Sequence, residues 1–197
     1  MLLNWLERAA VNNPLRSVLQ RHVGAKKLIR LGGDLTGGRV LEIGCGRGIG
    51  ADIALSDFGA ASVDAFDLDP KMVKQAKCYL NKHGDKAHVW VGDASAISVP
   101  GSTYDAVLDF AIIHHVPEWR QAVREIQRVL KPGGYFYGEE ILRAFIDHPI
   151  ARRLFVHPLN DRFDAAEFTK ELESVGLEVV EKEELWGVIT WVAARKL

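Results

Sequence analysis

Cysteine, charge of one sign and long apolar runs are all scarce in this sequence, and each absence excludes a class of protein. Cys45 and Cys78 are the two cysteines among 197 residues, and they provide neither a disulfide framework nor a thiolate metal site. No run approaches the roughly 18 apolar residues of a membrane-spanning helix. The formal net charge of −1 offers nucleic acid no basic surface. We expect a protein with no resident metal, no membrane contact and no nucleic-acid partner.

The first residues also lack the features of a secretory leader. The stretch MLLNWLERAA carries Glu7 and Arg8 and has no basic segment ahead of an apolar one. A chain of this length can bury one core of ordinary size. We therefore expect a single cytoplasmic domain over residues 1–197, and we make no prediction of its oligomeric state.

Short apolar runs alternate with longer amphipathic segments through the middle of the chain. The runs predict strands, and the segments between them predict helices. The expected strands are 39–44, 62–69, 88–93, 104–110 and 134–140, and the expected helices lie near 48–57, 70–83 and 117–130. This alternation predicts an α/β fold with a parallel sheet between two helical layers, which is a three-layer αβα architecture.

The two ends of the chain depart from the alternation. The N-terminal part predicts a helix that begins at Pro14 and ends at Gly32 and Gly33. The C-terminal part predicts a helix near 165–175 and then a hairpin, which makes the sheet seven-stranded and mostly parallel, with one antiparallel strand near its C-terminal edge. The segments of the single domain are a helical cap (1–35), a cofactor-binding core (36–140), a lid or substrate insertion (141–163) and the C-terminal helix and hairpin (164–197).

The stretch VLEIGCGRGIG, residues 40–50, follows the first strand with four glycines at alternate positions. Glycine costs about 0.5–1 kcal/mol relative to alanine in regular structure, so this spacing requires a sharp turn or a closely bound ligand. One glycine would be enough for a turn, and open parallel sheets bind ligands at this end of their strands, so we favour a ligand. Gly46, Gly48 and Ala51 also match, weakly, the dinucleotide pattern G-x-G-x-x-G/A.

Carboxylates near the loop indicate the class of ligand. Asp67 closes the second expected strand, where an acidic side chain can accept hydrogen bonds from ribose hydroxyls. Asp93 closes the third strand, where it can accept from an adenine amino group while Ala94 leaves room for the ring. Glu42 lies inside the first strand, where its charge would oppose a pyrophosphate but suit a cationic cofactor.

These stretches resemble the motifs of class I, Rossmann-like methyltransferases, whose cofactor S-adenosylmethionine has a sulfonium and an ammonium group and no phosphate. VLEIGCGRGIG is similar to their first motif, [DE]-x-G-x-G-x-G, and AFDLDPKMVKQAK and VGDAS are similar to the second and third. YDAVLDFAIIHHVPEWRQAVREIQRVLKPGG is similar to the strand, helix and turn that follow. The resemblance covers about residues 36–140 and is greatest to the type 11 branch, which acts on small molecules.

The resemblance implies a set of cofactor-binding residues. They are Glu42, Gly44, Cys45, Gly46, Gly48, Asp67, Leu68, Asp93, Ala94 and Phe110. In this interpretation Asp67 binds the ribose, Leu68 packs against the adenine and the backbone of Phe110 receives the ammonium group. Asp109 departs from the small residue common at its position. Arg47, at a variable position of the motif, could pair with the cofactor carboxylate.

Methyl transfer requires alignment of a nucleophile with an activated carbon and, for some acceptors, a base. His115 follows the fourth strand above the expected cofactor and is our candidate catalytic base, although packing in the pocket wall is the alternative interpretation of the His114–His115 pair. The candidate substrate residues are His114, Arg152 and His157. We expect residues 1–35 and 141–163 to fold over the cofactor and enclose the acceptor.

The sequence therefore predicts an S-adenosylmethionine-dependent methyltransferase that acts by in-line displacement on an O, N or C nucleophile of a small-molecule methyl acceptor. A catalytically silent S-adenosylmethionine-binding module and a nicotinamide-dependent oxidoreductase are the alternatives. Methylation of nucleic acid is disfavoured, because the fourth strand is followed by DFAI and not by the N/D-P-P-Y/F motif of amino-methylating enzymes.

Overall fold

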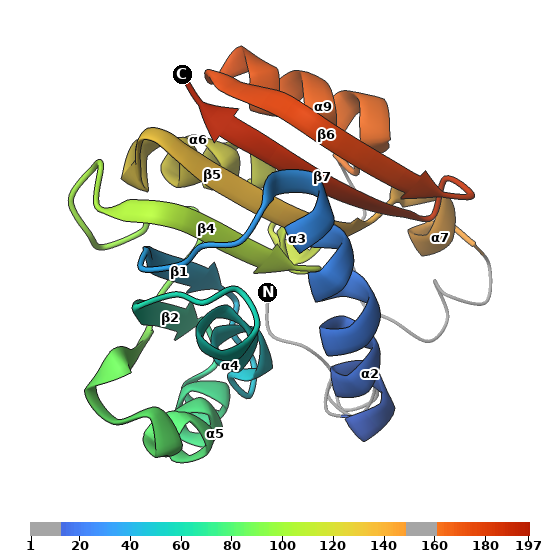
Figure 1. Ribbon diagram of the computed structural model, residues 1–197. Helices are drawn as coiled ribbons and strands as arrows, with labels where there is room; N and C mark the ends of the chain where they lie inside the picture. Colours follow the sequence, from blue (N-terminus) through green and yellow to red (C-terminus); the bar gives the residue numbers. More distant parts are fainter. Residues whose placement is uncertain (1–12, 149–160) are drawn as a thin grey trace.

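The computed structural model describes residues 13–148 and 161–197, which fold around one twisted seven-stranded sheet (Figure 1). The strands are β1 (Arg39–Ile43), β2 (Ser62–Asp67), β3 (Ala87–Val91), β4 (Tyr104–Phe110), β5 (Leu130–Ile141), β6 (Leu177–Leu185) and β7 (Ile189–Lys196). Their order is β3-β2-β1-β4-β5-β7-β6, and β7 runs antiparallel to both of its neighbours. The predicted mostly parallel seven-stranded sheet is confirmed, and its antiparallel strand lies one place in from the edge.

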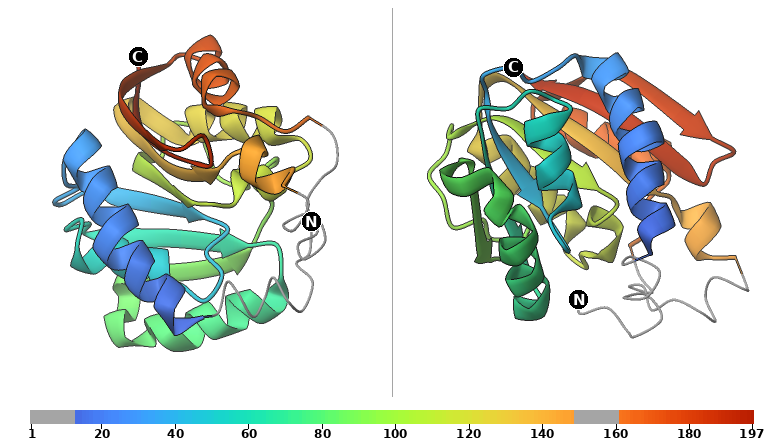
Figure 2. Two further views of the ribbon diagram at one scale, coloured as in Figure 1. Left: turned by 90° about the vertical axis from the view of Figure 1, so that its right-hand side faces the viewer. Right: turned by 60° about the horizontal axis from the view of Figure 1, so that its bottom comes forward.

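Helices cover both faces of the sheet (Figure 2). The N-terminal helices are α2 (Pro14–Leu19), the π-helix η1 (Gln20–Ala25) and α3 (Lys26–Gly32). The others are α4 (Ile49–Ser56), α5 (Pro70–Leu80), α6 (Trp119–Val129), α7 (Arg143–Ile146) and α9 (Ala165–Ser174), with short 3₁₀ turns η2 (Asn81–Lys86) and η3 (Ile113–His115). Leu28, Ile53 and Leu80 from α3, α4 and α5 pack on one face, whereas Ile126 and Phe168 from α6 and α9 pack on the other.

Local chemistry explains where these helices begin and end. The Asp69 carboxylate accepts a hydrogen bond from the backbone N–H of Lys71, and Pro70 occupies the first helical position of α5. Asp164 and Glu167 form a reciprocal capping box at the start of α9. Gly33, at φ 87°, ends α3 as expected.

The strand β5 differs from its prediction, because it begins at Leu130 and not at residue 134. Pro132 disfavours helical geometry at the residue before it, and α6 accordingly ends at Val129. Leu130 pairs with Tyr104, and the next paired residue of β5 is Tyr135, so the intervening residues form a bulge.

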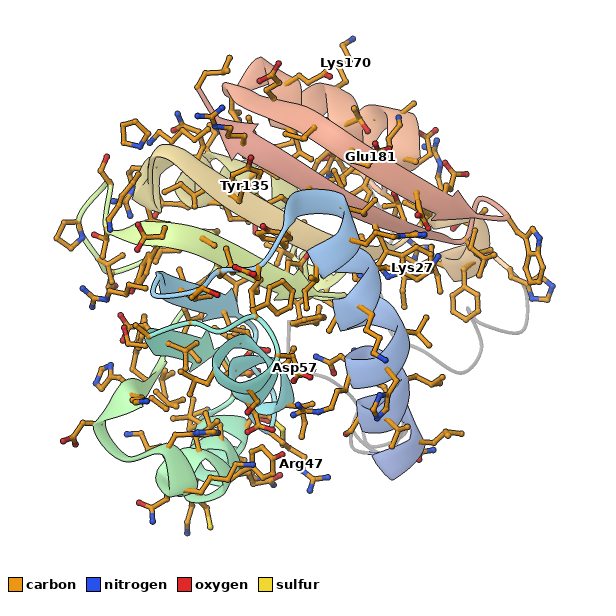
Figure 3. The ribbon with its side chains drawn as sticks, viewed as in Figure 1. Lys27, Arg47, Asp57, Tyr135, Lys170 and Glu181 are labelled. Atoms are coloured by element: carbon orange, nitrogen blue, oxygen red, sulfur yellow. The ribbon has the colours of Figure 1, made fainter. Side chains whose placement is uncertain are left out.

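The N-terminal helix projects beyond the sheet at the carboxyl ends of the parallel strands (Figures 1 and 2). The carboxylates of Asp52 and Asp57, both in or next to α4, form ion pairs with Arg21 of η1. Asp57 is labelled in Figure 3, on the side of the core that faces this helix. Gly24 packs against the side chain of Glu139, which leaves no space for a Cβ atom there. These contacts fasten the helix to the core.

Candidate functional site

A cavity of about 330 Å³ opens at the carboxyl ends of β1, β2 and β4, at the point where the strand order reverses between β1 and β4. Ligand cavities in proteins are typically about 300–1,000 Å³, and parallel sheets bind ligands at this position. The predicted residues that line it are Glu42, Gly44, Cys45, Gly46, Asp67, Leu68, Asp93, Ala94, Phe110 and His115. Gly48 lies outside the lining.

Glycine is required at different positions of the loop for different structural reasons. Gly44 has φ 62°, and a Cβ atom there would lie 2.7 Å from the side chain of Ile112. Gly48 has φ 87° and caps α4, with a would-be Cβ atom 2.9 Å from Leu80 of α5. Gly46 has φ 51°, and apart from its chain neighbours no atom of the described residues lies within 4 Å of its would-be Cβ. Its backbone is therefore open to the cavity, which is the geometry that close approach of a ligand requires.

Asp67 joins the end of β2 to the glycine loop. One carboxylate oxygen accepts a hydrogen bond from the backbone N–H of Gly46 at 2.8 Å, and the other accepts from Asp69 at 2.8 Å. Each oxygen has a second lone pair, so both can also accept hydroxyl groups from the cavity. Burial raises the pKa of Asp67, although the two backbone bonds oppose that shift.

Apolar side chains also line the cavity near Asp67 in the sequence and in the loop after β3. They are Phe66, the half-exposed Leu68 and the buried Ala94. The carboxylate of Asp93 accepts hydrogen bonds from the N–H and the hydroxyl of Ser95, at 2.8 and 2.7 Å. These bonds fix Asp93 in the cavity lining, two residues beyond β3.

Glu42 is the most unusual lining residue, because its side chain is almost completely buried, with 2% exposed. Burial raises its pKa, and the neighbouring acids Asp67 and Asp109 raise it further, whereas a hydrogen bond from the backbone of Ala51 and the charge of Arg16 lower it. Its Oε2 atom has no hydrogen-bond partner among the described residues. A buried acceptor of this kind, facing a cavity, fits a cationic ligand such as the ammonium group of S-adenosylmethionine.

Sequence reasoning missed Arg16 of α2, which lines the cavity with Ser17 and Gln20. Its guanidinium donates a hydrogen bond to the backbone oxygen of Phe110 at 3.4 Å. Burial lowers the pKa of Arg16, although the carboxylates of Glu139 and Glu42 oppose that shift. The signal was present in the sequence: the polar residues Arg16, Ser17 and Gln20 recur at helical spacing within an otherwise apolar segment.

The turn after β4 forms another part of the cavity wall. Ala111 has φ 62°, an uncommon conformation for a residue with a side chain. The turn is held by Asp109, which accepts from the backbone N–H of Ile112 at 3.0 Å, and by Glu140, which accepts from Ile113 at 2.7 Å. Both acids are fully buried. His115 reaches the cavity from this turn.

His114 is directed away from the main cavity, into a separate small one next to Trp119 and Phe163. Its Nδ1 atom lies 2.6 Å from the Glu140 carboxylate. The rings of His114 and His115 are in contact, with centroids 4.1 Å apart. The structure therefore brings His115, and not His114, to the place where an acceptor would approach.

The predicted lid is described only in part. Arg152 and His157 lie outside the described residues, as does most of the segment around them. The described residues of 141–163 do not line the main cavity, whereas α2, from the N-terminal segment, does. Arg47, labelled in Figure 3, lines the cavity from the glycine loop.

Two other chemical features bear on the site. Cys45 is buried, and its pKa is raised by burial and by Glu42 and Asp67, which disfavours a nucleophilic thiolate. Within residues 13–148 and 161–197, no three His, Cys, Asp or Glu side chains gather as metal ligands. No helix in these ranges is long and apolar enough to cross a bilayer.

Comparison with known proteins gives the class of the fold. Residues 40–134 match a family described as "Methyltransferase domain". The chain is 33% identical over 151 residues, 76% of its length and 56% of the relative, to a Mycolicibacterium smegmatis protein described as a "Probable S-adenosylmethionine-dependent methyltransferase". It is 30% identical over 150 residues, 72% of its length and 46% of the relative, to 2-methyl-6-phytyl-1,4-hydroquinone methyltransferase of Synechocystis. It is 36% identical over 104 residues, 52% of its length and 37% of the relative, to fatty-acid O-methyltransferase of Mycolicibacterium smegmatis.

The chain thus spans about half the length, or less, of these curated relatives. Among solved structures, a SAM-dependent methyltransferase from Aquifex aeolicus superposes with a TM-score of 0.74 at 23% identity, covering 97% of both chains. The [4+2]-cyclase SpnF superposes with a TM-score of 0.73 at 17% identity, covering 87% of this chain and 79% of that one. At these identities the structures establish the fold alone, and the fold supports more than one chemistry.

Sequence match, fold and cavity agree. Residues 40–134 form a methyltransferase domain of the class I, S-adenosylmethionine-dependent family. The family resemblance, the Rossmann-like fold and S-adenosylmethionine as the family's cofactor are confirmed.

Proposed function

We propose that this protein transfers the methyl group of S-adenosylmethionine to a small-molecule acceptor in the cavity between the glycine loop and α2. The observation that carries the proposal is the grouping of Glu42, Asp67 and Asp93 around one cavity, beside an open glycine backbone. These acids come from the ends of three different strands and can meet a cation, a ribose and an adenine edge respectively. An ionised Glu42 can pair with a cation but would repel a pyrophosphate, which argues against a nicotinamide dinucleotide.

In this proposal the protein contributes binding and alignment. The cofactor, when bound, supplies a methyl group on positive sulfur. Asp67 holds the ribose, Asp93 and Ala94 hold the adenine, and the Phe110 backbone oxygen accepts from the ammonium group. Alignment of this kind can lower a reaction barrier by about 7–11 kcal/mol. His115 stands at the cavity wall, where its imidazole can remove a proton from an acceptor that must lose one.

The acceptor is inferred from the shape of the site and from the relatives. α2 closes one side of the cavity and Ile112, Val116 and Pro117 give an apolar wall, which together favour a small, partly apolar molecule over a polymer. The names of two relatives specify a fatty acid and a phytyl hydroquinone as their acceptors. We therefore propose acceptors with a nucleophilic oxygen or ring carbon attached to an apolar group.

The test has two parts. Calorimetry with S-adenosylhomocysteine and with NAD should detect binding of the first and not of the second. A panel of fatty acids, long-chain hydroquinones and small polar acids is then incubated with methyl-labelled cofactor, and products are identified by mass spectrometry. Binding of NAD alone would reject the proposal, and cofactor binding with no labelled product across the panel would favour a catalytically silent binding module.

A further inference from the structure

Glu42 is surrounded by other acids at the carboxyl ends of the strands. Asp67 is the last residue of β2 on one side, and Asp109 lies in β4 on the other, with Glu42 paired opposite Leu108 in the β1–β4 register. Among the described residues, Arg16 of α2 is the cation that acts on Glu42. The Arg16 guanidinium also donates to the Phe110 carbonyl and lies near a further acid, Glu139. Glu42 therefore shares this cation with other acceptors.

The packing around Glu42 leaves it little opportunity for solvation. Its side chain is 2% exposed, and Oε2 has no hydrogen-bond partner among the described residues. A Cβ atom on Gly50 would lie 1.9 Å from its Oε1 atom, so the start of α4 presses directly on the carboxyl group. An ionised carboxylate without a partner in such a place is strongly disfavoured, whereas a protonated one is tolerated.

We propose that Glu42 carries a proton in the free protein and releases it when a cationic ligand enters the cavity, so that cofactor binding is coupled to proton release. This inference rests on the proposed cofactor. The O–H bond of the Glu42 carboxyl group breaks, the proton passes to the buffer, and the charge left on the carboxylate is balanced by the ligand's cation. The raised pKa of Glu42 agrees with a protonated carboxyl group in the free protein.

The coupling has a defined sign. A ligand that binds best to the ionised form binds more tightly as the pH rises, until Glu42 is already ionised in the free protein. With one linked proton, affinity rises by at most about tenfold per pH unit. The ligand's ammonium group is protonated at about pH 6.5, since α-amino groups titrate at about pH 7.7–8.0.

The experiment is calorimetry in two buffers with different ionisation enthalpies, at about pH 6.5. The apparent binding enthalpy then changes in proportion to the protons released. Three ligands are compared: S-adenosylmethionine with sulfonium and ammonium groups, S-adenosylhomocysteine with the ammonium alone, and 5′-methylthioadenosine with neither. We expect proton release with the first two and none with the third.

Glu42→Gln keeps the shape of a protonated glutamic acid and should bind the first two ligands without proton release. Asp109→Asn is the matched control, and it should release as many protons as the wild type. Binding of S-adenosylmethionine without proton release, or equal release by Glu42→Gln, would overturn this inference and leave the proposed function intact. If neither cofactor form binds, both fail. Should Glu42→Gln not fold, a wild-type dissociation constant that does not change with pH would overturn it equally well.

Discussion

Asp109 and Glu140 present their carboxyl groups to each other, fully buried, at the ends of the neighbouring strands β4 and β5. A hydrogen bond between two carboxyl groups requires a proton on one of them. Glu140 also receives hydrogen bonds from the backbone of Ile113 and lies 2.6 Å from Nδ1 of His114. The negative charge is therefore best placed on Glu140, and the proton on Asp109. Together they fasten the turn that forms one wall of the cavity.

This assignment predicts an asymmetry between two conservative substitutions. Asp109→Asn replaces a neutral donor by another neutral donor and should change the free energy of unfolding little. Glu140→Gln places an amide N–H₂ group among N–H donors and leaves at least one without an acceptor, which costs about 1–3 kcal/mol. Urea denaturation of both variants at about pH 8, above the pKa of about 7 of Glu140, measures the difference. Equal destabilisation by the two would mean that the proton does not reside on Asp109.

The same pair predicts how stability depends on pH. Burial raises the pKa of Glu140 from 4.5 to about 7, and the pKa values of Asp109, Glu42 and Glu139 are raised as well. The folded protein then binds more protons than the unfolded chain between about pH 4.5 and about pH 7, so this stabilisation is lost as the pH rises through that range. The midpoint of thermal unfolding should be higher at about pH 5.5 than at about pH 8. A flat profile would show that solvent reaches these acids.

Asp67 gives a prediction for the cofactor. Asp67→Ala should weaken binding of S-adenosylhomocysteine by about 1–3 kcal/mol, because the ribose and the Gly46 amide both lose an acceptor. Asp34 is a matched control, since its carboxylate accepts from the amide two residues on, as Asp67 does, but away from the cavity. Asp34→Ala should leave the dissociation constant unchanged. If Asp67→Ala also binds normally, the ribose is held elsewhere.

Substitution of Gly46 tests whether this glycine is needed for close approach of the cofactor or only for the turn. Gly46 and Gly37 both have positive φ and no atom near a would-be Cβ, but only Gly46 lines the cavity. Gly46→Val and Gly37→Val should therefore lose similar amounts of stability, on the order of 1–2 kcal/mol, while only Gly46→Val loses cofactor binding. Circular dichroism and calorimetry on the pair provide the two measurements. Normal binding by Gly46→Val would assign the glycine to the turn alone.

Substitution of His115 distinguishes a catalytic base from a residue that only packs in the cavity wall. His115→Gln should leave the dissociation constant of S-adenosylhomocysteine within about twofold, and should reduce methyl transfer by about 10²-fold or more if a proton is removed. The pH profile of transfer should also lose the limb that the base contributes. An unchanged rate would assign His115 to packing of the cavity wall. The acceptor found by mass spectrometry serves as substrate.

The sequence predicted those parts of the site that depend on neighbouring residues. The glycine loop, Asp67 and Asp93 each follow a strand, and the strands are recognisable from their apolar runs, so their meeting at one edge follows from a parallel sheet. The mostly parallel seven-stranded sheet and both helical layers were predicted on the same basis. Gly48 is an exception. The motif does not specify that Gly48 packs against Leu80 and lies outside the cavity lining.

The remainder depends on contacts that no local pattern specifies. Arg16 meets the carbonyl of Phe110 across 94 positions of sequence, and Glu140 meets the amide of Ile113 across 27. The partner of Asp109 is fixed by the pairing of β4 with β5, which places two acids side by side in a layer that usually carries none. These contacts need the assembled sheet before they can be recognised.

The π-helix η1 sets the rotational phase between two ends of one helix. Each α-helical residue turns the chain by about 100°, and a π turn accommodates one residue more than an α turn. Before it, Arg16 faces the cavity, and after it, Leu28 and Leu31 face the sheet. If the partly exposed Val23 were deleted, α3 could keep its packing against the sheet. The residues of α2 would then turn by about 100° around the helix axis, which would move Arg16 away from the cavity. A change in chain length outside the cavity would then alter which molecules the site accepts while leaving the packed core as it is.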